Sequence, residues 1–194
     1  MRFKDKVAIV TGGGSGIGKE VARRFVAEGG SVVVNGRDAA KTDAAAREID
    51  PTSKQVAVQT GDIALPATGE ALVKTTIDRF GRLDVLFNNA GIFAPKPFLE
   101  VTEAEYDRFV DIILKGKFFA AQAVAKAMKA SGRGGRSSDQ LHVGTERRFL
   151  RLTTPEPISV LPVVPTPAHQ MENFQWSHAF KRNYSHPCKL GRLR

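Results

Sequence analysis

The first stretch able to do chemistry is a glycine-rich turn, TGGGSGIG, at residues 11–18. It follows a short β-branched run at residues 6–10 and precedes a segment with the apolar spacing of a helix. Glycines at such a corner let the backbone turn sharply and approach a ligand. The free N–H groups at the helix start and the positive end of its dipole favour phosphate. The turn therefore predicts an anion site without charged side chains, and a tight corner with no ligand is the alternative.

The elements around this turn alternate between two kinds. β-Branched and apolar runs of strand length are separated by segments of ten or more residues with helical apolar spacing. This alternation implies right-handed crossovers and a parallel sheet covered on both faces, so the predicted fold class is α/β, a Rossmann-like doubly wound parallel sheet. The predicted strands are 6–13, 31–38, 54–63 and 83–91, and the predicted helices are 16–30, 38–50, 69–81 and 103–131.

Three motifs stand in order at the carboxyl ends of these strands: TGxxxGIG at 11–18, GDI at 61–63 and NNAG at 88–91. Together they resemble the short-chain dehydrogenase/reductase family, over residues 5–135. Because the resemblance ends at Gly135, it implies an incomplete sheet of about four strands in the order 3-2-1-4. A dinucleotide would lie across the carboxyl ends of these strands. It also implies a small alcohol or carbonyl substrate and, in most members, a homo-oligomer.

The resemblance assigns roles to individual residues. The pyrophosphate and ribose would be held by Gly12, Ser15, Gly16, Ile17 and Gly18. Asp62 and Ile63 would flank the adenine. The second ribose contact and the brace at the strand end would come from Asn88, Asn89, Ala90 and Gly91.

The tip of the second strand bears on the choice between NADP and NAD. An acidic residue there would accept hydrogen bonds from the ribose 2′-OH and repel a 2′-phosphate. This chain has Gly36 at the tip and Arg37 next to it. Because a guanidinium pairs well with phosphate, we favour NADP(H) over NAD(H). The alternative is that Arg37 is a solvated turn residue neutralised by Asp38.

The chain departs from the family at the proton donor. In the family a Tyr-x-x-x-Lys pair lies on one helical face, where the lysine charge lowers the pKa of the phenol. This chain has two tyrosines. Tyr106 is followed four residues later by Val110, and Tyr184 by Cys188, with Pro187 in between. Neither forms the pair, so we predict no catalytic residues and little or no turnover.

The family's other active-site residues are also missing from their expected positions. Ser137 and Ser138 follow Gly135 with no apolar strand before them, so we expect them in a polar loop. The position of the family's active-site asparagine, three residues before Gly116, is Ile113. A fourth strand without a successor would be an exposed edge, and Phe118, Phe119, Val124 and Met128 on the last helix would lose partners.

Composition changes at the same place. Residues 1–135 carry 21 alanines and a net charge of +4, whereas residues 136–194 carry 2 alanines, all four histidines, six of ten prolines and a net charge of +5. We therefore predict two parts, a dinucleotide-binding domain at 1–135 and a poorly ordered basic tail at 136–194. Such a tail is what an out-of-frame coding segment would produce, and we state the frameshift as a hypothesis.

Several function classes are disfavoured. The four histidines lack metal-ligand spacing, so no metal site is expected. The chain has no run of 18 apolar residues, so we expect no membrane span. It has a single cysteine, Cys188, which favours a cytoplasmic protein. The second hypothesis is a working oxidoreductase with a donor from the tail or another subunit. The third is a non-catalytic protein that binds nucleic acid or another partner, because the basic tail has aromatic residues among its cations.

Overall fold

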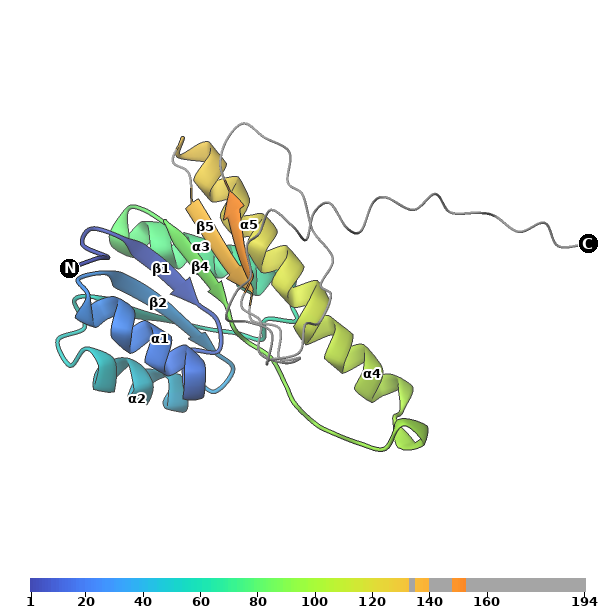
Figure 1. Cartoon of the computed structure of the whole chain (residues 1–194). Helices are drawn as coiled ribbons and strands as arrows, with labels where there is room; N and C mark the ends of the chain where they lie inside the picture. Colours follow the sequence, from blue (N-terminus) through green and yellow to red (C-terminus); the bar gives the residue numbers. More distant parts are fainter. Residues whose placement is uncertain (133–134, 140–147, 153–194) are drawn as a thin grey trace, which may run out of the picture. The chain divides into compact units, whose positions relative to one another are not determined.

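The computed structural model describes residues 1–132, 135–139 and 148–152 (Figure 1). They all belong to one compact unit, Met1–Val160. The predicted α/β class is confirmed, and so is the parallel order β3-β2-β1-β4. These strands are β1 (Val7–Val10), β2 (Ser31–Gly36), β3 (Val56–Thr60) and β4 (Val85–Asn88).

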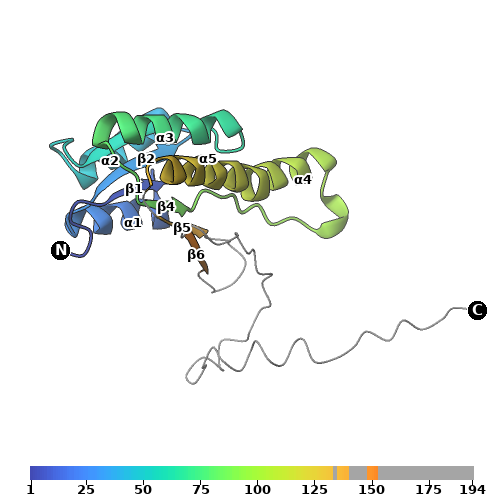
Figure 2. The same ribbon diagram turned by 90° about the horizontal axis from the view of Figure 1, so that it is seen from above.

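The helices cover the sheet in two layers. The first layer is α1 (Gly16–Ala27) and α2 (Ala39–Ile49), and the second is α3 (Pro66–Phe80) and α5 (Lys117–Ala130). Figure 2 shows α3 and α5 side by side on one face of the sheet, opposite α1. Because side chains alternate along a strand, Ala8 and Val10 pack with Phe25 of α1, whereas Ile9 packs with Leu72 of α3. Burial on both faces explains why the strands read as continuous apolar runs.

A fifth strand corrects one expectation. Ser137 and Ser138 do not lie in a loop, because both belong to β5 (Gly135–Asp139), which pairs in parallel with β4. Next to it, β6 (Arg148–Leu152) pairs antiparallel with β5, so β4 is not the edge strand. The unpaired N–H and C=O groups along β4 offer hydrogen bonds to any backbone without proline. Backbone pairing therefore forms this strand despite its polar sequence.

The predicted helix at 103–131 is confirmed in extent but has a wide turn inside it. It consists of α4 (Glu103–Val110), the π-helical turn η2 (Asp111–Gly116) and α5. A short 3₁₀ helix, η1 (Phe98–Glu100), precedes it, and α4 extends beyond the strands (Figure 1). The expected loss of partners was wrong for Val124 and Met128, which are buried in a core cluster with residues such as Leu72 of α3 and Leu86 of β4. Phe118, by contrast, is 60% exposed, and its ring meets that of Phe119 edge to face.

Candidate functional site

A cleft opens at the carboxyl ends of the four parallel strands. Its volume is about 480 Å³. Seven of the residues assigned from the resemblance or from charge line it, namely Gly12, Ser15, Arg37, Asp62, Ile63, Ala90 and Gly91. Residues that were not singled out complete its wall, among them Gly14, Asn35, Lys41, Thr42 and Ile112.

The NNAG segment braces the glycine-rich turn. The Nδ2 group of Asn89 donates to the carbonyl of Thr11 at 3.0 Å. In return, the backbone N–H of Ala90 donates to Thr11 Oγ1 at 2.9 Å. Thr11 is fully buried, so these bonds join the ends of β1 and β4 without competition from water. Asn88 is fully buried and does not line the cleft, and its Nδ2 group donates to the carbonyl of Lys117 at 2.8 Å.

The first turn of α1 begins beside this brace. Ser15 is the N-cap residue, and its side chain makes no capping hydrogen bond. The first turn contains no acidic residue. Gly16 and Ile17 are exposed, and Gly18 is buried against the turn. The orphan N–H groups of this turn are therefore not occupied by a side-chain cap, and a negative charge placed there would be stabilised.

The tip of β2 presents two cations at the cleft rim. Gly36 ends the strand, and the exposed Arg37 follows it. Asp38 caps α2, because its Oδ1 accepts from the backbone N–H of Lys41 at 3.0 Å. Within the described part of the chain, no ion pair joins Arg37 to Asp38. Lys41 also lines the cleft, and no sequence motif indicated this role.

The end of β3 forms the next wall. The buried side chain of Asn35 donates from Nδ2 to the carbonyls of Gln59 and Gly61, at 3.0 and 3.1 Å. The Oδ1 atom of Asp62 accepts from the backbone N–H of Ala64 at 3.0 Å. Ile63 is buried at 4% exposure. The backbone carbonyl of Asn35 accepts from Gly13 N at 2.8 Å. Asn35, in β2, is thus bonded both to the glycine-rich turn and to the end of β3, a role that no sequence motif indicated.

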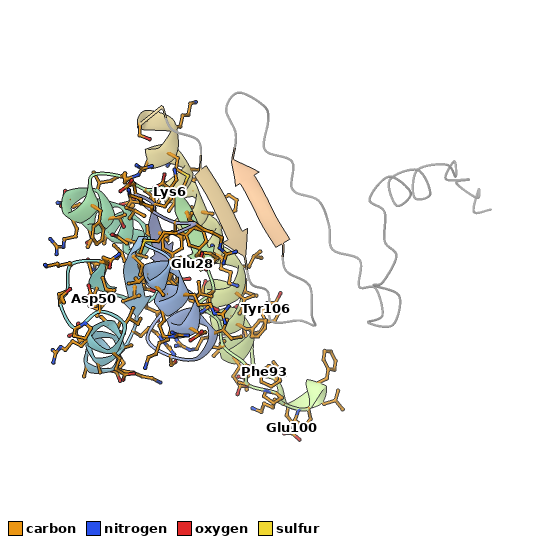
Figure 3. All side chains as sticks on the ribbon, turned by 60° about the vertical axis from the view of Figure 1, so that its left-hand side comes forward. Lys6, Glu28, Asp50, Phe93, Glu100 and Tyr106 are labelled. Atoms are coloured by element: carbon orange, nitrogen blue, oxygen red, sulfur yellow. The ribbon has the colours of Figure 1, made fainter. Side chains whose placement is uncertain are left out.

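The residues considered as catalytic candidates come from three different elements, α4, η2 and β5. Tyr106 is on α4 and is 63% exposed, at the same end of the unit as Phe93 and Glu100 (Figure 3). Ile113 is in the π-helical turn, with its Cδ1 3.2 Å from the point where a Cβ on Gly91 would lie. Ser137 is buried, and its Oγ has no hydrogen-bond partner among the residues that the structure describes.

Other candidates lie outside the described residues. These are Tyr184, Cys188, Lys189 and the histidines at 142, 169, 178 and 186. Among the residues that the structure does describe, no group of three or more His, Cys, Asp or Glu could hold a metal ion. Within that same part, no helix has the length and apolar character needed to cross a membrane.

The comparison with known families decides what this cleft belongs to. The family model described as short chain dehydrogenase matches residues 6–136. This chain is a member of the short-chain dehydrogenase family. The resemblance inferred from the three motifs is confirmed, and the match ends one residue beyond Gly135. Members of the family use NAD(H) or NADP(H) with small-molecule substrates.

Individual relatives match a similar share of this chain. Galactitol 2-dehydrogenase from Agrobacterium fabrum is 40% identical over 136 residues, which are 70% of this chain and 52% of that protein. Levodione reductase from Leifsonia aquatica is 40% identical over 137 residues, 69% of this chain and 51% of that protein. The crystal structure of levodione reductase superposes with a TM-score of 0.64 at 37% identity, covering 71% of this chain and 54% of that one. The chain therefore spans about half the length of the relatives it matches.

Proposed function

We propose that this chain binds NADP(H) in preference to NAD(H), through the adenosine half of a short-chain dehydrogenase site. The observation that carries the proposal is the pair of cations, Arg37 and Lys41, at the cleft rim beyond Gly36. A 2′-phosphate on the adenosine ribose would meet these cations. No carboxylate stands at position 36 to accept a hydrogen bond from a 2′-OH or to repel a phosphate.

The remaining contacts follow the family roles. The uncapped first turn of α1, with Gly12 and the segment 15–18, is the proposed pyrophosphate and ribose site, because its N–H groups and dipole favour negative charge. Asp62 and Ile63 would flank the adenine, at the cleft wall made by the end of β3. Asn89 and Ala90, already bonded to Thr11, would hold this end of β4 rigid under the ribose.

Three charge-neutralising variants of the full chain test the cofactor preference. Arg37→Gln and Lys41→Gln are each expected to weaken NADPH binding by roughly 5- to 30-fold, because each removes one exposed charge-assisted contact. NADH binding should change by less than about twofold, since NADH has no 2′-phosphate. Arg47→Gln is the matched control, an exposed arginine in the last turn of the same helix and outside the cleft. Equal losses for NADH and NADPH in the first two variants would refute the preference.

The parent reaction of the family is hydride transfer between a nicotinamide and an alcohol or carbonyl. Bound NADP(H) would supply or accept the hydride, and a neighbouring acid must supply the proton. In residues 1–194 neither tyrosine is followed by a lysine four positions later, and Tyr106 is exposed on α4. We therefore propose that this chain binds the cofactor but turns over alcohols or carbonyls little or not at all.

A panel of carbonyl substrates with NADPH tests this second part of the proposal. The expected result is no consumption above the background of a heat-inactivated sample. Consumption that Tyr184→Phe abolishes would instead establish a working oxidoreductase with a donor from residues 136–194. The nucleic-acid alternative has no support in the comparisons, and most of the basic segment that suggested it, residues 140–147 and 153–194, lies outside the described residues.

A further inference from the structure

Thr42 occupies an unusual position behind the tip of β2. It lies in α2, lines the cleft and is 1% exposed. Its hydroxyl donates to the carbonyl of Asp38 at 2.6 Å, one helical turn earlier. This bond fixes the side-chain rotamer, so Oγ1 points toward the strand tip and the glycine-rich turn.

Two glycines face this hydroxyl. A Cβ on Gly14 would lie 3.2 Å from Thr42 Oγ1, and a Cβ on Gly36 would lie only 2.2 Å from it. The Cβ and Cγ2 atoms of Thr42 would be 3.4 and 3.5 Å from the same Gly36 Cβ, which are ordinary contacts. The hydroxyl oxygen is therefore the atom that excludes a side chain at position 36.

We propose that Thr42 is a specificity-determining residue that keeps the tip of β2 free of any side chain. An acidic residue at position 36 needs a Cβ in space that Thr42 Oγ1 fills. The 2′ position of the ribose is consequently left to Arg37 and Lys41. This inference rests on the proposed NADP(H) preference and adds its steric cause. It makes the preference depend on two positions, since Gly36→Asp without a change at Thr42 forces an overlap.

The test is a double-mutant cycle on the full chain. The probes are adenosine 2′,5′-bisphosphate and AMP, measured by calorimetric titration, so that neither the nicotinamide half nor turnover is needed. Gly36→Ala and Gly36→Asp are each expected to weaken both nucleotides by roughly tenfold or more, the range of overpacking penalties. Thr42→Ala added to Gly36→Ala should restore both. Added to Gly36→Asp, it should restore AMP and leave AMP the tighter ligand.

Three results would overturn the proposal. Additive losses would show that positions 36 and 42 do not interact. Tight AMP binding by Gly36→Asp alone would show that Thr42 excludes nothing. Recovery with Thr42→Val equal to that with Thr42→Ala would show that the hydrogen bond, not the occupied space, matters, because valine keeps the volume and loses the donor. Thermal unfolding of each variant identifies any loss of binding that is a loss of folding, and the Gly36→Ala pair supplies an uncharged cycle.

The outcome separates this inference from the proposed function. If the unmodified chain binds AMP as tightly as the bisphosphate, the NADP(H) preference fails. The coupling between positions 36 and 42 in AMP binding still reports on Thr42 in that case.

Discussion

Asp84, just before β4, is expected to contribute more to stability than any surface carboxylate of the described unit. Its side chain, 10% exposed, accepts from Val7 N at 2.9 Å and from Nε and Nη2 of Arg82 at 2.8 and 2.6 Å. Asp84→Asn replaces one accepting oxygen with an NH₂ group. Hydrogen bonds to charged groups are worth about 1.5–3 kcal/mol, and an unpaired buried N–H costs about 1–3 kcal/mol. Because Arg82 keeps access to water, we expect a loss of about 2 kcal/mol in the free energy of unfolding.

Urea denaturation at pH 7 measures this loss as a shift of the midpoint at unchanged slope. The matched control is Asp78→Asn, since Asp78 pairs with Lys74 on the surface of α3 and both side chains are more than half exposed. Exposed pairs contribute about 0–1 kcal/mol. Similar losses in the two variants would refute the reasoning, because they would make burial irrelevant.

The same variant has a defined pH dependence. Burial opposes ionisation of Asp84, but the hydrogen bonds from Arg82 and Val7 outweigh it, and its pKa lies below the ordinary value. A lowered folded-state pKa stabilises the protein above the unfolded pKa of about 3.9, and this stabilisation is lost as the pH falls through the folded pKa. The difference between the unmodified chain and Asp84→Asn should hold from pH 7 to about 5 and shrink below about 4. A difference that grows on acidification contradicts this assignment.

Three further outcomes are expected. Gly18→Ala should weaken NADPH binding by roughly tenfold or more, because its Cβ would lie 2.3 Å from the carbonyl oxygen of Gly12, and unchanged binding in calorimetric titration would show that the turn has room. Ser137→Ala should raise the free energy of unfolding by about 1 kcal/mol, since it removes a buried hydroxyl without a partner in the described chain, and a lower urea midpoint would contradict this. The coding DNA beyond codon 135, translated in the other two frames, should contain an apolar strand, a serine and Tyr-x-x-x-Lys, and their absence from both frames would end the frameshift hypothesis.

The core strands could be predicted because their side chains report their environment. Val32, Val33 and Val34 form a continuous apolar run, which is typical of a strand buried on both faces, and all three are fully buried. The motifs at the strand ends could also be recognised from the sequence, since glycines and asparagines at fixed distances after a strand are typical of a dinucleotide site.

The rest depends on contacts that no local pattern contains. β5 forms because the edge of β4 offers hydrogen bonds. Ser137 is buried because of its place in the sheet, although its polar side chain would suggest an exposed position. Lys41 reaches the cleft because Asp38 starts α2 beside Gly36, a placement set by the crossover from β2. The role of Thr42 could not be predicted either, because its steric effect appears only when α2 is packed on the tip of β2.

Parallel titration of the full chain with NADPH and NADH is the most direct test of the account. It predicts saturable binding of both, with NADPH at least roughly tenfold tighter, the effect of one to two phosphate contacts from Arg37 and Lys41. Binding of NADH equal to or tighter than that of NADPH, or no saturable binding of either, would contradict it.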